Sequence, residues 1–138
     1  MKSVFLDTNV VIYAATGMAE SLEKHTIAAE LVSGPAFRVS AQVLAEFVSA
    51  VRRKSTPRLP EDEIAAWLSD LEALRPLPVD AAIVQRGRAI SAEHGLNYYD
   101  GAILAAAERL GCDTVLSEDM TDGRAYGAVT VRNPFKEG

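Results

Sequence analysis

The amino-acid sequence predicts one α/β domain with a mostly parallel central sheet of four or five strands. Short apolar runs bounded by polar residues alternate with longer segments of helical periodicity, as in a parallel sheet covered by helices on both faces. Two of the apolar runs end abruptly at acidic residues. Since no repeat, low-complexity segment or linker divides the chain, residues 1–138 are predicted to form a single domain.

The first apolar run covers residues 3–6 and is followed by Asp7, Thr8 and Asn9. Its length and flanks predict a strand buried on both faces, with Asp7 at its carboxyl end. Ligands of open α/β sheets bind at that edge, which makes Asp7 a candidate site residue. The alternative is that one of these three residues caps the helix that follows, because all three types cap well.

Helices are predicted over residues 10–16 and 20–32, followed by a strand over residues 37–40. Ser40 then caps a helix with one apolar stripe, formed by Val43, Leu44, Phe47, Val48 and Val51. Glu46 lies on the flank of this stripe, where it can point along the carboxyl edge of the sheet. A solvated glutamate favoured by the helix dipole is the competing interpretation.

The only basic concentration in the sequence is Arg52, Arg53 and Lys54, with Arg58 nearby in a loop that contains Pro57. These side chains are candidates for phosphate contacts, or they are cations favoured at a helix C-terminus. A further helix is predicted to begin at Pro60 or Glu61. Its Trp67 is expected to pack in the core or at an interface, because it lies at helical spacing among leucines.

A short edge strand is predicted over residues 77–79, and a helix over residues 80–94 that Gly95 ends. His94 is interpreted as a favourable group at the helix end rather than as a ligand. Another helix is predicted over residues 100–110.

Asp100 lies on the same side of that last helix as its apolar stripe of Ile103, Leu104, Ala107 and Leu110. A buried carboxylate costs several kcal/mol unless it is paired or binds a metal, and no lysine or arginine shares the stripe. A functional acid is therefore favoured over a helix cap or a distant ion pair.

The remaining strands are predicted over residues 113–117 and 129–131, with Glu118 and Asp119 directly after the first of them. In this topology Asp7 and Asp119 end neighbouring strands, while Glu46 and Asp100 approach the same edge from helices. Four converging carboxylates repel one another unless cations neutralise them. Because all the donors are hard oxygen ligands, the sequence predicts a Mg²⁺ or Mn²⁺ site suited to phosphoryl chemistry.

Composition excludes several other classes of protein. Cys112 is the only cysteine, which rules out an internal disulfide, and it is expected to be a buried, inert thiol. No zinc spacing or glycine-rich phosphate loop is present. A net charge of −5 argues against general electrostatic binding of nucleic acid. Because neither a signal-peptide core nor a membrane span is evident, a cytoplasmic protein is expected.

Four short motifs together resemble the PIN-domain ribonucleases, and among them the VapC-type toxins of toxin–antitoxin modules. The motifs are Leu6 to Asn9, Ala45-Glu46, Tyr99 to Ala102, and Ser117 to Asp119. The resemblance covers essentially the whole chain and implies a PIN-like three-layer α/β/α fold. One departure is Gly101, which stands where such sequences often have alanine and which loosens the helix start by up to about 1 kcal/mol.

The resemblance implies metal-dependent endonucleolytic cleavage of RNA that leaves a 5′-phosphate and a 3′-hydroxyl. Asp7, Glu46, Asp100 and Asp119 would bind the metal, with either Asp119 or Asp122 completing the set. Residues expected to support these acids are Thr8, Asn9, Ser117 and Asp122. It further implies a homodimer and a cognate VapB-type antitoxin.

Two other functions remain open from the sequence. A receiver-like signalling domain also has an acidic metal pocket, but it would carry paired acids after the first strand and a lysine after the last. Here Asp7 is followed by Thr8 and Asn9, and Val131 by Arg132. A non-catalytic PIN-like scaffold that binds RNA or protein is the second, and the four intact acids argue against it.

Overall fold

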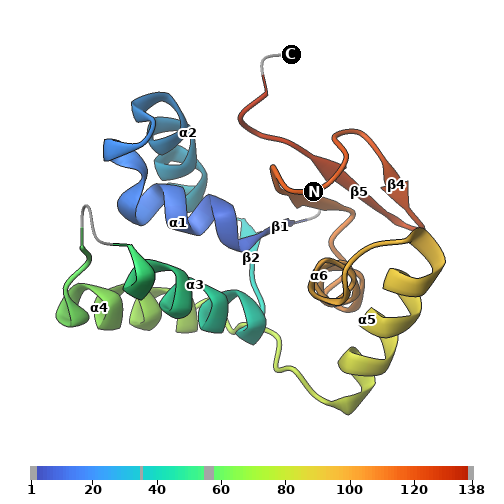
Figure 1. Cartoon of the computed structure of the whole chain (residues 1–138). Coiled ribbons are helices and arrows are strands. Elements are labelled where there is room, and N and C mark those ends of the chain that lie inside the picture. Colours follow the sequence, from blue (N-terminus) through green and yellow to red (C-terminus); the bar gives the residue numbers. More distant parts are fainter. Residues whose placement is uncertain (1–2, 35, 55–57, 137–138) are drawn as a thin grey trace.

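The computed structural model describes residues 3–34, 36–54 and 58–136 (Figure 1). Within this part of the chain, five strands form one sheet in the order β2-β1-β3-β5-β4. Neighbouring strands are parallel except for β4, which pairs antiparallel with β5. The strands are β1 (Val4–Leu6), β2 (Phe37–Arg38), β3 (Thr114–Leu116), β4 (Ala125–Tyr126) and β5 (Val129–Arg132). The predicted mostly parallel sheet is confirmed.

Helices cover the sheet in two groups, which Figure 1 shows on opposite sides of β1. One group contains α1 (Thr8–Thr16), the 3-10 turn η1 (Gly17–Ala19), α2 (Leu22–Ser33), α3 (Ala41–Arg53) and α4 (Glu61–Glu72). The other contains α5 (Ala81–His94) and α6 (Tyr98–Arg109), of which α6 contacts β3 and β5. The arrangement is a three-layer α/β/α fold, as predicted. Among the described residues, no helix combines the length and apolarity needed to cross a bilayer.

The hydrophobic core lies between these layers. Phe5 and Leu6 of β1 are fully buried, as is Val115 of β3. Helix α6 is buried from Gly101 to Ala107, which explains why its sequence is apolar on nearly every side. Cys112 is buried and free, as predicted.

Helix starts differ slightly from the prediction, because the residues that cap them lie earlier in the chain. Helix α1 begins at Thr8, since Asp7 caps it by accepting a hydrogen bond from the Thr8 amide. Helix α6 begins at Tyr98 instead of Asp100, since the Asn97 side chain accepts from the Asp100 amide. The predicted end of α5 is confirmed, because Gly95 follows His94 in the left-handed conformation with φ 69°.

One predicted strand is absent from the sheet, and one strand of the sheet was not predicted. The segment 77–79 is not a strand: only Leu77 forms a single parallel bridge, with Ser40, and Pro78 lacks the amide hydrogen that would continue it. Strand β4 was not predicted, because it has only two residues, which form a short antiparallel pair with β5. Pro35, which together with Ser33 and Gly34 is expected from the sequence to end the helix predicted over residues 20–32, and the loop residue Pro57 lie outside the described residues.

Helices α5 and α6 approach each other most closely at two glycines. A Cβ atom on Gly101 would lie 2.5 Å from the carbonyl oxygen of Gly87 and 2.8 Å from the Cβ atom of Ser91. A Cβ atom on Gly87 would lie 2.9 Å from the Cα atom of Ala102. The two backbones therefore leave no room for a side chain, which explains why glycine replaces alanine at position 101.

We expect Gly101→Ala to lower the free energy of unfolding by about 1–3 kcal/mol, the usual cost of overpacking. The sign of this change distinguishes two effects, since helix propensity alone would make the alanine variant more stable by up to about 1 kcal/mol. Urea unfolding of the two proteins measures the difference. A variant more stable than the wild type would contradict the close packing.

Candidate metal centre

Asp7 occupies the carboxyl end of β1 and is only 5% exposed. Its Oδ1 accepts a hydrogen bond of 2.7 Å from the Thr8 amide, and its Oδ2 accepts one of 2.7 Å from the Ser117 hydroxyl. Its pKa is raised to about 7, chiefly by burial, while these two hydrogen bonds act in the opposite direction. The negative charges of Asp119 and Glu46 also raise this pKa. The capping and the functional interpretations of Asp7 are thus compatible.

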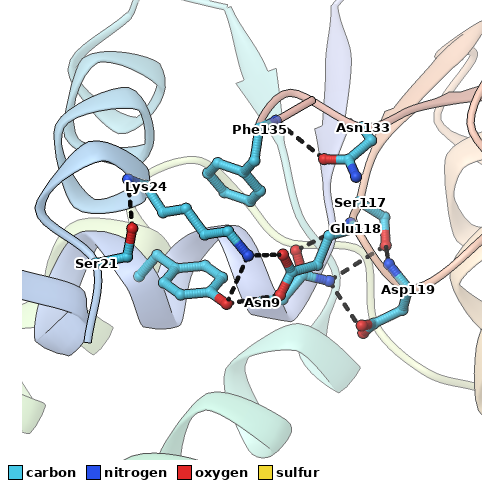
Figure 2. Close-up of polar contacts among 9 residues, drawn as sticks. Asn9, Ser21, Lys24, Ser117, Glu118, Asp119, Asn133 and Phe135 are labelled. Atoms are coloured by element: carbon cyan, nitrogen blue, oxygen red, sulfur yellow. Dashed lines mark hydrogen bonds and ion pairs between the residues drawn. The ribbon is translucent and has the colours of Figure 1, made fainter. Parts of the chain in front are cut away.

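Asn9 connects the first turn of α1 to the end of β3 (Figure 2). Its Nδ2 lies 3.1 Å from Asp119 Oδ2, 3.2 Å from Ser117 Oγ and 3.4 Å from Asp7 Oδ2. The backbone amide of Asp119 also donates to Ser117 Oγ, at 3.1 Å. One neutral amide group therefore lies between the oxygens of two acids, where its donors partly offset their charge.

Glu46 approaches the same region from α3. Its Oε1 accepts hydrogen bonds from the Thr8 hydroxyl at 2.8 Å and from Gln42 Nε2 at 3.3 Å. Gln42 also donates to the backbone oxygen of Tyr99 at the start of α6, at 3.1 Å. The glutamate is therefore held by side-chain bonds to α1 and by a neighbour that contacts α6, which does not support a freely solvated side chain.

Asp100 enters from the first turn of α6 and is half-buried. Its Oδ2 accepts a hydrogen bond of 2.9 Å from Asn97, the residue that caps the helix. Its pKa is raised by burial and then by the charges of Asp119 and Glu46, against the effect of the Asn97 bond. Because Asn97 supplies the cap, the structure does not support Asp100 as the cap.

The four predicted acids therefore influence one another electrostatically, although they come from four different elements. None of the salt bridges between described residues involves any of them. Their oxygen-only chemistry and mutual repulsion fit a hard divalent cation such as Mg²⁺ or Mn²⁺. Within the described ranges, however, no three acidic, histidine or cysteine side chains are gathered closely enough to hold an ion as they stand.

A cavity of about 320 Å³ has two of these acids, Glu46 and Asp119, in its wall. It is lined by Thr8, Asn9, Ile12, Glu46, Ser49, Ala50, Arg53 and Asp119. Arg53 is the only residue of the predicted basic cluster on this wall, and its Nη1 donates to Ser49 Oγ at 2.6 Å. Arg52 instead pairs with Glu61, and Lys54 pairs with Glu20. The structure thus separates three residues that the sequence treats alike.

Asp122 lies apart from the other predicted acids. Its Oδ1 accepts a hydrogen bond of 2.8 Å from the Asn133 amide, and its Oδ2 lies 3.9 Å from Lys136 Nζ. The structure therefore brings Asp119, and not Asp122, to Asn9 and Ser117. This placement favours Asp119 as the fourth acid of the site.

The expected supporting residues Thr8, Asn9 and Ser117 all contact the acids. Two contributors were not predicted: Gln42, which donates to Glu46, and Glu118, which lies next to Asp119 but turns toward Tyr13 and Lys24. Helical spacing from Gln42 to Glu46 was a usable signal. Trp67, as expected, packs on a core residue, with its ring 5.9 Å from that of Phe47.

Comparisons with known proteins agree with this fold. The sequence model described as PIN domain matches residues 4–121. The crystal structure of FitAcB from Neisseria gonorrhoeae is 27% identical, with a TM-score of 0.62, and the match covers 96% of this chain and 98% of that chain. No curated protein matches the sequence.

Two further solved structures share the fold at lower identity. VapC20 from Mycobacterium tuberculosis, a toxin that cleaves the sarcin-ricin loop, is 17% identical with a TM-score of 0.63, over 85% of this chain and 92% of that chain. VapBC2 from Rickettsia felis, bound to a promoter DNA fragment, is 18% identical with a TM-score of 0.57, over 94% and 97%. Since the sequence match spans most of its length, the chain belongs to the PIN domain family.

Proposed function

We propose that this protein is a Mg²⁺- or Mn²⁺-dependent endoribonuclease and the toxin of a VapBC-type toxin–antitoxin module. The observation that carries the proposal is a set of four carboxylates, Asp7, Glu46, Asp100 and Asp119, in which Asp119 and Glu46 raise the pKa of both Asp7 and Asp100. None of the four forms a salt bridge with a described residue, and Glu46 and Asp119 line a cavity. Membership of the PIN domain family supports a nuclease. Similarity in fold to VapC20, which is a toxin, supports a toxin.

When bound, the metal would supply an activated water and stabilise the charge of the phosphate undergoing displacement. The four acids would hold it. Asp7 is oriented by Thr8 and Ser117, Glu46 by Thr8, and Asp119 by Asn9. Arg53, on the cavity wall, would bind an RNA phosphate and place the backbone beside the acids.

The test is cleavage of a structured RNA by the purified protein, with and without Mn²⁺ or Mg²⁺. Cleavage should need the metal, stop with EDTA, and leave products with a 5′-phosphate and a 3′-hydroxyl. End-labelled RNA separated on a sequencing gel distinguishes these ends. RNA binding with either metal but without any cleavage would support the non-catalytic scaffold instead.

Metal should raise the melting temperature, because an ion that binds only the folded state stabilises it by mass action. A free concentration of 100 times the dissociation constant corresponds to about 2.7 kcal/mol. The experiment is a thermal melt in EDTA and in a series of Mn²⁺ concentrations, with Ca²⁺ for comparison. An unchanged melting temperature up to millimolar Mn²⁺ would count against the metal centre.

Replacing Arg53 by glutamine should raise the KM for RNA about tenfold with little change in kcat, as expected for loss of a hydrogen bond to a charged group. The slope of log KM against log salt should also fall by about 0.7, the value for one phosphate contact on a single strand. Arg52→Gln is the matched control, because Arg52 pairs with Glu61 and does not line the cavity. Equal effects of the two substitutions would assign no special role to Arg53.

A cognate antitoxin is proposed to bind along α1. A second cavity, of about 500 Å³, shares this helix with the acidic cavity, because Ala15 and Thr16 continue the wall formed by Thr8, Asn9 and Ile12. Its other wall includes Ala66 and Trp67 of α4. An extended antitoxin segment in this groove would reach the acids with an arginine and block RNA or metal.

Co-expression with the product of the neighbouring gene should yield a complex that does not cleave RNA. Ala66→Arg should weaken that complex, whereas Ala65→Arg should not, since Ala65 is exposed but does not line the groove. Full cleavage by the purified complex would contradict the inhibition. The resemblance also implies a homodimer, which light scattering of the isolated toxin measures.

A further inference from the structure

Glu118 lies between Ser117 and Asp119, yet its side chain points away from the acids and toward α1 and α2 (Figure 2). Its Oε1 accepts a hydrogen bond of 2.8 Å from the Tyr13 hydroxyl, and its Oε2 lies 2.8 Å from Lys24 Nζ. The Tyr13 hydroxyl also accepts from Lys24, at 3.4 Å. Each of the three side chains thus contacts the other two.

Two aromatic rings lie beside the lysine of this network. Lys24 Nζ lies 5.1 Å from the ring centroid of Tyr13 and 5.7 Å from that of Phe135, and the two rings meet edge to face at 5.1 Å. The side chains of Lys24 and Glu118 are only 37% and 21% exposed. The contacts with Glu118 and Tyr13 raise the pKa of Lys24, so it remains charged.

The network leads directly to the acidic site through the backbone of Glu118. Its amide donates to Asn9 Oδ1 at 3.4 Å, while Asn9 Nδ2 donates to Asp119 at 3.1 Å. Tyr13 lies four residues after Asn9, on the same face of α1. Asp119 itself is exposed and forms no salt bridge with a described residue. Its position is therefore set by its bonds with Asn9 and Ser117 and by the loop that Glu118 anchors.

We propose that Tyr13 and Lys24 are positioning residues of the site: by holding Glu118, they fix Asp119 and Asn9 beside the other acids and keep a fifth carboxylate away from them. The proposal rests on the proposed function, because it assigns Asp119 to the metal. Neither residue lines the acidic cavity, and their side-chain hydrogen bonds go to Glu118 and to each other rather than to the four acids. Partners of this kind, one step beyond the residues that bind a metal, typically change metal affinity or activity by about 10–100-fold.

A purely structural ion pair elsewhere in the molecule provides the control. Arg86 Nε and Nη2 bind the two carboxylate oxygens of Glu108 at 2.9 and 3.0 Å, joining α5 to α6. Glu108 lies at the opposite end of α6 from Asp100. Arg86→Met removes an ion pair between two helices, as Lys24→Met removes one between α2 and the loop of Asp119, but it leaves that loop unchanged.

The test compares Tyr13→Phe, Lys24→Met, Lys24→Arg and Arg86→Met with the wild type. Tyr13→Phe removes only a hydroxyl, so folding should be preserved. Mn²⁺ affinity is measured by calorimetry without RNA, kcat and KM with an RNA substrate, and exchange of the Asp119 amide hydrogen in EDTA. Tyr13→Phe and Lys24→Met should weaken Mn²⁺ binding and lower kcat by about tenfold, with KM nearly unchanged and faster exchange at Asp119. Lys24→Arg should retain most of the wild-type values, and Arg86→Met all of them.

Unchanged Mn²⁺ affinity in both Tyr13→Phe and Lys24→Met would overturn the positioning role and leave the ribonuclease function intact. A loss of Mn²⁺ affinity in Arg86→Met as large as in Tyr13→Phe and Lys24→Met would also overturn the positioning role. A wild-type protein that binds Mn²⁺ but cleaves no RNA would instead refute the proposed function, while the affinities of the variants would still decide the positioning role. A wild-type protein that binds no Mn²⁺ would overturn both.

Discussion

Replacing Asp100 by asparagine is expected to reduce RNA cleavage at least about 100-fold while leaving the metal-free protein as stable as the wild type, or more stable. Asparagine keeps the shape of the side chain and removes a charge that Asp119 and Glu46 repel. The Asn97 bond to Oδ2 can persist, and no described lysine or arginine loses a partner. Residues that only support a metal ligand change activity by about 10–100-fold. We expect at least the upper value for Asp100, because it would hold the ion directly.

Two assays measure this effect: a thermal melt in EDTA, and cleavage with Mn²⁺ at a temperature where both proteins are folded. Asp122→Asn is the control, since Asp122 contacts Asn133 and Lys136 rather than the other acids, and it should cleave RNA normally. If Asp100 were instead part of a buried ion pair, its loss would cost about 3–5 kcal/mol. A destabilised Asp100→Asn variant with normal cleavage would therefore refute its assignment to the site.

The second large effect is a pH dependence of stability that originates at Asp7. Its pKa is 3.8 in the unfolded reference and about 7 in the folded, metal-free protein. Between these values the folded state binds one more proton than the unfolded state, so the free energy of unfolding falls as pH rises. At 1.36 kcal/mol per unit, a shift of this size corresponds to about 4 kcal/mol. Below about pH 4 and above about pH 7, the contribution of this residue is constant.

Asp7→Asn isolates this contribution from those of the other carboxyl groups. The stability of the variant relative to the wild type should increase from pH 4 to pH 7 and then level off. Urea unfolding in EDTA at closely spaced pH values provides the measurement. Saturating Mn²⁺ should reverse the order at pH 7.5, because the ion favours the charged form of Asp7 and the variant cannot supply that charge. A constant difference between the two proteins across the whole range would show that Asp7 titrates normally.

The sheet and the approach of the four acids follow from signals that the sequence carries locally. The apolar runs before Asp7 and Glu118 are as long as a buried strand needs, and helical spacing places Asp100 on the inward face of α6. Two acids at the ends of neighbouring parallel strands must lie near each other. These inferences needed no knowledge of distant contacts beyond the order of the strands.

Features that depend on partners outside one helix or strand were not predictable. Arg52 and Arg53 are adjacent in sequence, yet only the position of Glu61 decides which of them is paired. Lys24 and Glu118 are separated by 94 residues, and neither belongs to a pattern that indicates the other. Gly101 shows the same limit, because only the packing of α5 and α6 reveals why a side chain does not fit there.

The two oxygens of Asp7 are already committed in the metal-free protein, one to the Thr8 amide and one to the Ser117 hydroxyl. Folding has therefore removed the rotational freedom of this carboxylate before any ion arrives. Asp119, in contrast, is exposed and has one longer bond from Asn9, so it keeps more of that freedom. If the two acids bind an ion as proposed, the entropic cost of closing around it would fall mainly on Asp119, and Asp7 would be the preorganised side of the site.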